Sequence, residues 1–92
     1  MTPDAEKRYN DALVGLNAAC GIMINAISNH ALKRLIQRDI SEEKASDLTV
    51  NAPIVYPGNT PGTICQQKDN LRIVINERTG NIVTFIELEE DE

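Results

Sequence analysis

LRIVINERTGNIVTFIEL, residues 71–88, holds two apolar runs separated by a turn signal. The runs at 71–76 and 81–88 are rich in β-branched residues, which favour extended strands. The four residues between them, ERTG at 77–80, end in a glycine, as hairpin turns often do. The sequence therefore predicts an antiparallel hairpin over residues 71–88.

Two shorter extended segments precede the hairpin. Residues 54–56 and 63–67 are predicted strands, and the loop at 57–62, PGNTPG, contains two Pro-Gly turn signals. A tight turn at 68–70 connects the second of these strands to the hairpin. The C-terminal half is therefore predicted to be an antiparallel β-meander.

The N-terminal half shows helical spacing. A first helix is predicted to begin at Pro3, because proline and acidic residues are favoured in a first turn. Its apolar positions recur at steps of three and four as far as Ala19, and Gly21 then interrupts the pattern. Residues 21–27, GIMINAI, alternate in part like a strand, but a helix or a bent connection is the favoured interpretation.

Two further helices follow. The second is expected to be capped by Ser28 or Asn29 and to run to residue 37 or 38. The third is expected to begin after Ser41 and to end near Val50, before Pro53. The predicted fold class is α+β, with N-terminal helices packed on a C-terminal antiparallel β-meander in a single domain, residues 1–92.

The net charge of −5 is concentrated at the C-terminal end. Five of the last six residues are acidic, which leaves nine acidic and nine basic residues in the rest of the chain. Residues 89–92 are therefore interpreted as an acidic tail. A neutral body lacks the basic excess of nonspecific nucleic-acid binders, so any contact with RNA must be local.

The chain carries few signals for metals or membranes. Cys20 and Cys65 lack CxxC spacing, so no metal site and no cofactor are predicted. Two buried free thiols are the favoured interpretation, while pairing in an oxidising compartment stays open. The charged N-terminus does not resemble a signal peptide, and the apolar run at 15–27 is too short and too polar to span a membrane.

The segment SNHALKRLIQRDIS, residues 28–41, contains the only histidine of the chain. His30, Arg34 and Arg38 follow one another at steps of four, so on a helix they lie along one face. Imidazole can move protons near neutral pH, and guanidinium groups bind phosphate oxygens. These are the parts needed for RNA cleavage by a 2′-OH. The alternative is an ordinary solvated polar side of a surface helix, which spacing alone favours.

The last predicted strand adds further candidates. Strict alternation predicts one face with Ile82, Thr84 and Ile86 and another with Val83, Phe85 and Glu87. Thr84 is then a hydroxyl among isoleucines that can donate to a phosphate, although threonine is also common in strands. Pairing across the hairpin places Arg72 near Phe85, as a further cation, unless it pairs with Glu87 or is simply exposed.

In order, these features resemble the C-terminal ribonuclease toxin domains of bacterial polymorphic toxin and contact-dependent growth inhibition systems, which have the barnase–EndoU–colicin–RelE-like fold. The resemblance rests on His-x3-Arg-x3-Arg, on Ile40-Ser41 and on the ending LRIVIN-ERTGN-IVTFIEL. It covers residues 28–88 as a ribonuclease-like core and leaves 1–27 as a helical extension.

The resemblance implies a metal-independent endoribonuclease that cleaves tRNA or another structured RNA and is neutralised by a cognate immunity protein. His30 is then the general acid or base, Arg34 and Arg38 are phosphate ligands, and Thr84 donates a hydrogen bond in the transition state. Arg72 and Phe85 are expected to bind substrate; Phe85 stands where the family often has tyrosine and can stack on a base. The resemblance also implies secretion within a larger effector that acts in the target-cell cytoplasm.

Two other functions fit the sequence. A non-catalytic interaction module, such as an immunity protein, an antitoxin or a phage adaptor, agrees with the net acidity, because inhibitors of basic nucleases are commonly acidic. A small nucleic-acid-binding regulator could use Arg34 and Arg38, but the lack of basic excess argues against it.

Overall fold

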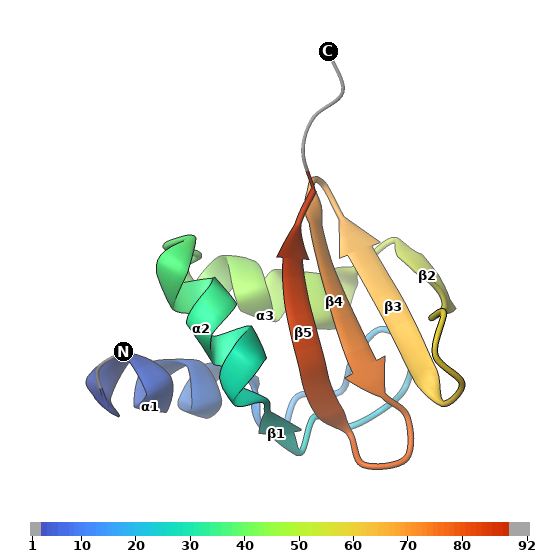
Figure 1. Cartoon of the computed structure of the whole chain (residues 1–92), viewed down its shortest axis with the longest axis horizontal. Coiled ribbons are helices and arrows are strands. Elements are labelled where there is room, and N and C mark those ends of the chain that lie inside the picture. Colours follow the sequence, from blue (N-terminus) through green and yellow to red (C-terminus); the bar gives the residue numbers. More distant parts are fainter. Residues whose placement is uncertain (1–2, 89–92) are drawn as a thin grey trace.

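The computed structural model describes residues 3–88 and contains three helices and one five-stranded mixed sheet, with strand order β1-β5-β4-β3-β2 (Figure 1). The helices are α1 (Pro3–Leu13), α2 (Asn29–Gln37) and α3 (Glu42–Asn51). The strands are β1 (Ala26–Ile27), β2 (Ile54–Pro57), β3 (Thr63–Lys68), β4 (Leu71–Asn76) and β5 (Asn81–Glu87). The predicted α+β class is confirmed. The predicted acidic tail, residues 89–92, lies outside the described residues.

The second and third helices begin at the predicted serine caps. Ser28 Oγ accepts a hydrogen bond from the backbone N–H of Ala31, and Ser41 Oγ accepts one from Lys44. Each cap satisfies one of the backbone donors that a helix start leaves unpaired.

The first helix is shorter than its apolar spacing predicts. It ends at Leu13, and residues 14–25 fold into a loop with backbone hydrogen bonds from Gly15 to Ile24 and from Ala18 to Ile22. Gly15 and Gly21 both have a φ of 93°, which no helical residue adopts. Ala18 and Ile24 are buried although they lie in this loop, so apolar spacing here reflected burial and not helix.

A short parallel strand replaces the helix or bend favoured for residues 21–27. Ala26 and Ile27 of β1 pair with Asn81 and Ile82 at the start of β5. The sheet is therefore mixed, and only β2 to β5 form the predicted antiparallel meander. Two residues carry too little alternation to distinguish such a strand from a helix segment.

A β-bulge changes the predicted faces of β5. Ile75 pairs with Ile82, but Val74 pairs with Thr84, so Val83 is an extra residue opposite β4. A bulge shifts the alternation of the residues beyond it. Ile82 and Phe85, both 1% exposed, therefore face the core together, and Thr84 turns to the other side of the sheet. The prediction that Thr84 shares a face with Ile82 is wrong for this reason.

The helices cover one face of the sheet, and Figure 1 shows the other face without a helix over it. The core lies between the helices and the covered face, and its largest fully buried apolar side chains are Leu13, Ile24, Leu35, Leu48, Ile75, Ile82 and Phe85. This one-sided arrangement is common in antiparallel sheets and leaves the second face available for contacts.

One edge strand of the sheet is β2, and the two-residue β1 forms the other edge. The backbone N–H of Gly58 donates to Thr63, so alternation turns the amide position of Pro57 away from β3. Proline has no N–H to offer there, and Pro53 stands just before the strand. The β2 edge is therefore poorly suited to pairing with a further strand.

Candidate functional site

Helix α2 runs beside β5 in the same direction (Figure 1). At one end, Ser28 Oγ donates to the carbonyl oxygen of Val83 at 2.6 Å, and at the other Arg38 Nη1 lies 3.6 Å from Glu87 Oε1. From Ser28 to Arg38 a helix rises about 15 Å, and from Val83 to Glu87 a strand advances about 13 Å. The two elements therefore advance by similar lengths between these contacts. His30 and Thr84 lie at about the same height along the common direction of α2 and β5.

The three residues of the α2 stripe differ in their surroundings. Each four-residue step turns the helix by about 40°, so the stripe slants around it. His30 is exposed beside a shallow hollow that Glu6 and Lys33 also line, Arg34 is half-buried, and Arg38 reaches β5.

Arg38 is the member of the stripe with a partner. Its ion pair with Glu87 joins two partly exposed side chains, so it is weak. Within residues 3–88, the side chains of His30 and Arg34 have no hydrogen-bond or ion-pair partner. Helix α2 contains no acidic residue, so its cations are not neutralised within the helix.

The side of the sheet that no helix covers is here called the open face. The strand register aligns its side chains in rows across the strands. One row across it is Tyr56, Cys65, Val74 and Thr84, and the next row is Ile54, Gln67, Arg72 and Ile86. These two rows contain one cation, Arg72, and no carboxylate. The acidity of the chain is therefore absent from these two rows of the open face.

A polar cluster of Tyr56, Gln67 and Arg72 occupies one part of the open face. The Arg72 guanidinium carbon lies 5.7 Å from the centre of the Tyr56 ring, a cation–π distance. Gln67 Oε1 accepts long hydrogen bonds from Tyr56 and from Arg72 Nη2, both at 3.4 Å. The Nε of Arg72 is buried and has no hydrogen-bond partner.

Sequence reasoning missed Tyr56 and Gln67. Each lies in a predicted strand, but only the register across β2, β3 and β4 shows that they meet Arg72. A lone aromatic residue in an edge strand was the one available signal, and it does not identify its partners.

The structure places Thr84 and Phe85 on opposite sides of β5. Thr84 is half-buried on the open face, whereas Phe85 lies in the core opposite Ile73. The prediction that Phe85 stacks on a base is therefore wrong. Arg72 pairs with Ile86 and not beside Phe85, which puts it on the same face as Thr84.

The two cysteines are free thiols on different sides of the sheet. The backbone N–H of Cys20 donates to the buried Gln66 side chain on the covered face, while Cys65 is buried in the first row of the open face. Among residues 3–88, no three His, Cys, Asp or Glu side chains are grouped so that they could hold a metal ion.

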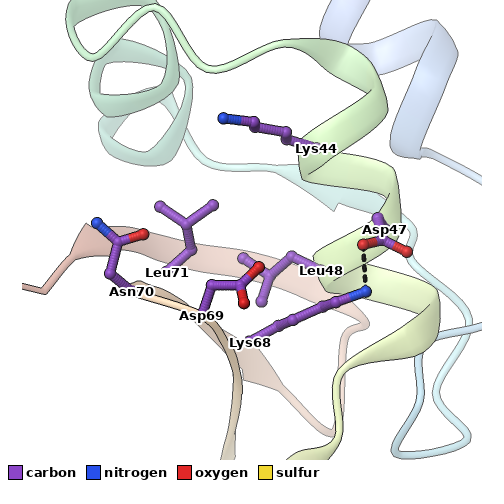
Figure 2. A pocket seen from close by; sticks show the side chains of 7 residues that line it. All are labelled: Lys44, Asp47, Leu48, Lys68, Asp69, Asn70 and Leu71. Atoms are coloured by element: carbon purple, nitrogen blue, oxygen red, sulfur yellow. Dashed lines mark hydrogen bonds and ion pairs between the residues drawn. The ribbon is translucent and has the colours of Figure 1, made fainter.

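A separate small hollow lies between α3 and the turn that joins β3 to β4 (Figure 2). Lys68 donates a hydrogen bond to Asp47 there, and this bond, with a second from Asn51, holds the pKa of Asp47 below its usual value. The hollow measures about 80 Å³, well below the roughly 300–1,000 Å³ of typical ligand pockets. Its ion pair stabilises the hairpin end and does not form a ligand site.

Comparison with known proteins finds no family model and no curated protein that matches this chain. In the part of the chain that the structure describes, none of the helices has the length and apolar character needed to cross a membrane.

Proposed function

We propose that the protein is an endoribonuclease whose site lies along α2 and the neighbouring strand β5. The observation that carries this proposal is that acidic side chains are absent both from α2 and from two rows of the open face. His30 and Arg34, both without partners among the described residues, lie on a helix that has no acidic residue and that packs on β5, and the two open-face rows to which β5 contributes have no carboxylate either. The cations of α2 attract a polyanion locally although the whole chain is acidic, with Glu6 in the hollow beside His30 and Glu87 against Arg38 as opposing charges.

The chemistry assigns one role to each side chain. His30 accepts the proton of a ribose 2′-OH, and the freed oxygen attacks the adjacent phosphorus. The bond from phosphorus to the 5′ oxygen breaks, that oxygen takes a proton from water, and a 2′,3′-cyclic phosphate remains. Arg34 and the Thr84 hydroxyl stabilise the negative charge that develops on the phosphoryl oxygens.

Arg38 joins this site by exchanging its partner. Its ion pair with Glu87 is partly exposed, so a phosphate can replace the carboxylate at small cost. Under this proposal the substrate is tRNA or another structured RNA, and a cognate immunity protein covers this site until the enzyme reaches a target-cell cytoplasm within a larger secreted effector. The agreement of the α2 stripe and of Thr84 with the toxin-domain pattern supports this assignment.

The test compares wild type with His30→Ala on purified tRNA and total RNA, analysed on denaturing gels. We expect discrete products with cyclic phosphate ends from wild type and a loss of about 10²- to 10⁴-fold in rate for His30→Ala. Gln37→Ala, an exposed change on the same helix, is the matched control and should cleave normally. Thermal unfolding should be the same for all three proteins.

Intact RNA with wild type would overturn the proposal and favour a non-catalytic interaction module. One surface of this chain fits such a partner: an apolar hollow beside the 57–62 loop, lined in part by Val55, Pro57, Pro61 and Ile64. A pull-down with wild type and with Val55→Asp would then test whether this hollow holds the partner.

A further inference from the structure

We infer that Tyr56, Gln67 and Arg72 form a nucleobase-binding subsite on the open face, selective for bases that present carbonyl oxygens. The identity of the ligand as RNA rests on the proposed function. The subsite itself has a separate readout, because it binds a base away from the atoms that react.

The register places this cluster on the path of an RNA strand that crosses the open face. Tyr56 and Thr84 stand in the same row, separated by Cys65 and Val74. Three strand spacings amount to about 14 Å, so a nucleotide near the cleaved bond can reach Tyr56 without distorting the sheet. The side chains between them, Cys65 and Val74, are small or apolar. They therefore do not obstruct a base or sugar that lies across this part of the sheet.

The polar groups of the cluster are arranged as donors. Arg72 has no acceptor atom, so the oxygen of the Gln67 amide must face it. That orientation leaves the two N–H groups of the Gln67 amide without a hydrogen-bond partner among the described residues. The Nε–H of Arg72 also has no partner, but it is buried in this structure, so the Gln67 amide is the donor that a ligand can reach.

This donor set determines which bases fit. Uracil presents carbonyl oxygens and guanine presents an O6 and an N7, all of which accept hydrogen bonds. Adenine also has acceptors at N1 and N7, but it has no carbonyl oxygen, and the N6 amino group beside those acceptors meets donors unfavourably. The Tyr56 ring, held against the Arg72 guanidinium, supplies a stacking surface that any base can use, so stacking gives affinity and the donors give selectivity.

The test measures fluorescence anisotropy of labelled single-stranded oligouridylate and oligoadenylate at low salt, with His30→Ala as the background so that the probe survives. We expect oligouridylate to bind more tightly. Tyr56→Leu should weaken binding of both probes about 10-fold, and Tyr56→Phe should retain it. Gln67→Leu should reduce the preference for uridylate while binding of adenylate changes little.

Three outcomes separate this subsite from the proposed function. Equal binding of both probes, or no effect of Tyr56→Leu in a protein that unfolds at the wild-type temperature, would overturn the subsite. Intact RNA with wild type, together with Tyr56-dependent binding of oligouridylate, would overturn the ribonuclease and keep the subsite. If both hold, Tyr56→Leu should raise KM for RNA cleavage and leave kcat nearly unchanged, as a group that binds away from the reacting atoms should. Should Tyr56→Leu unfold, Gln67→Leu decides the question through the base preference.

Discussion

The two faces of the sheet use the same residue type for different purposes, as Gln66 and Gln67 show. Gln66 is fully buried on the covered face, where its amide donates to the carbonyls of Leu48 and Thr49 and accepts from the N–H of Cys20. Gln67, the next residue, lies on the open face with its N–H groups unpaired among the described residues. The comparison teaches that the face of a strand decides whether a polar side chain connects core elements or serves a ligand.

Exchanging the neighbours Phe85 and Thr84 for alanine should show this difference most strongly. Phe85→Ala empties a core position and should lower the free energy of unfolding by about 3–5 kcal/mol. Thr84→Ala, on the open face, should cost less than about 1 kcal/mol and, under the proposed function, should lower RNA cleavage instead. Chemical denaturation of both variants checks this. Equal losses of stability would mean that the bulge does not separate the two side chains.

The glutamine pair gives the next largest difference. Gln66→Leu leaves a partly buried N–H and two buried carbonyl groups without their side-chain partner, so we expect a loss of about 3 kcal/mol in unfolding free energy. Gln67→Leu should change stability by less than about 0.5 kcal/mol. Denaturant titration of the two proteins measures the contrast, and a Gln67→Leu protein as unstable as Gln66→Leu would contradict it.

Two glycines with positive φ extend the comparison to the loops. At Gly80 a Cβ would stand 2.4 Å from the carbonyl oxygen of Met23, beside β1, while at Gly62 it would meet nothing within 4 Å. Gly80→Ala should therefore cost about 2 kcal/mol or more, and Gly62→Ala about 1 kcal/mol from backbone strain alone. Thermal unfolding ranks the two variants. A smaller loss for Gly80→Ala would show that residues 23–25 can move away from Gly80 at little cost.

The smallest effect concerns the ion pair beside the covered face. Because Lys68 lowers the pKa of Asp47 in the folded protein, the folded state holds this proton less tightly than the unfolded state. The contribution of the pair is present above the ordinary aspartate pKa of about 3.9 and is lost as the pH falls through the lower folded value. The gap in unfolding free energy between wild type and Asp47→Asn should therefore narrow from pH 7 to pH 3. The difference in unfolding free energy between wild type and Lys68→Met, which removes the other partner, should narrow over the same pH range.

Prediction from sequence succeeded where local signals were strong. The serine caps located the starts of α2 and α3, and β4 occupies the predicted residues 71–76. It failed at residues 14–27, where positive φ at two glycines and a two-residue strand depend on contacts with distant parts of the chain. It also failed at Val83, since nothing in an apolar run indicates which residue a bulge will leave unpaired.

The α2 stripe and Thr84 are therefore candidates that the sequence suggests by itself, while their arrangement in space was not predictable from it. Spacing along one helix places His30 and Arg34 near each other whatever the rest of the chain does, because that geometry is local. The face that Thr84 occupies, the burial of Phe85 and the meeting of Tyr56 with Arg72 depend on strand register and on a bulge. Register is set when one face of the sheet is buried against the helices, so only the tertiary structure decided which side chains face solvent and can meet a ligand.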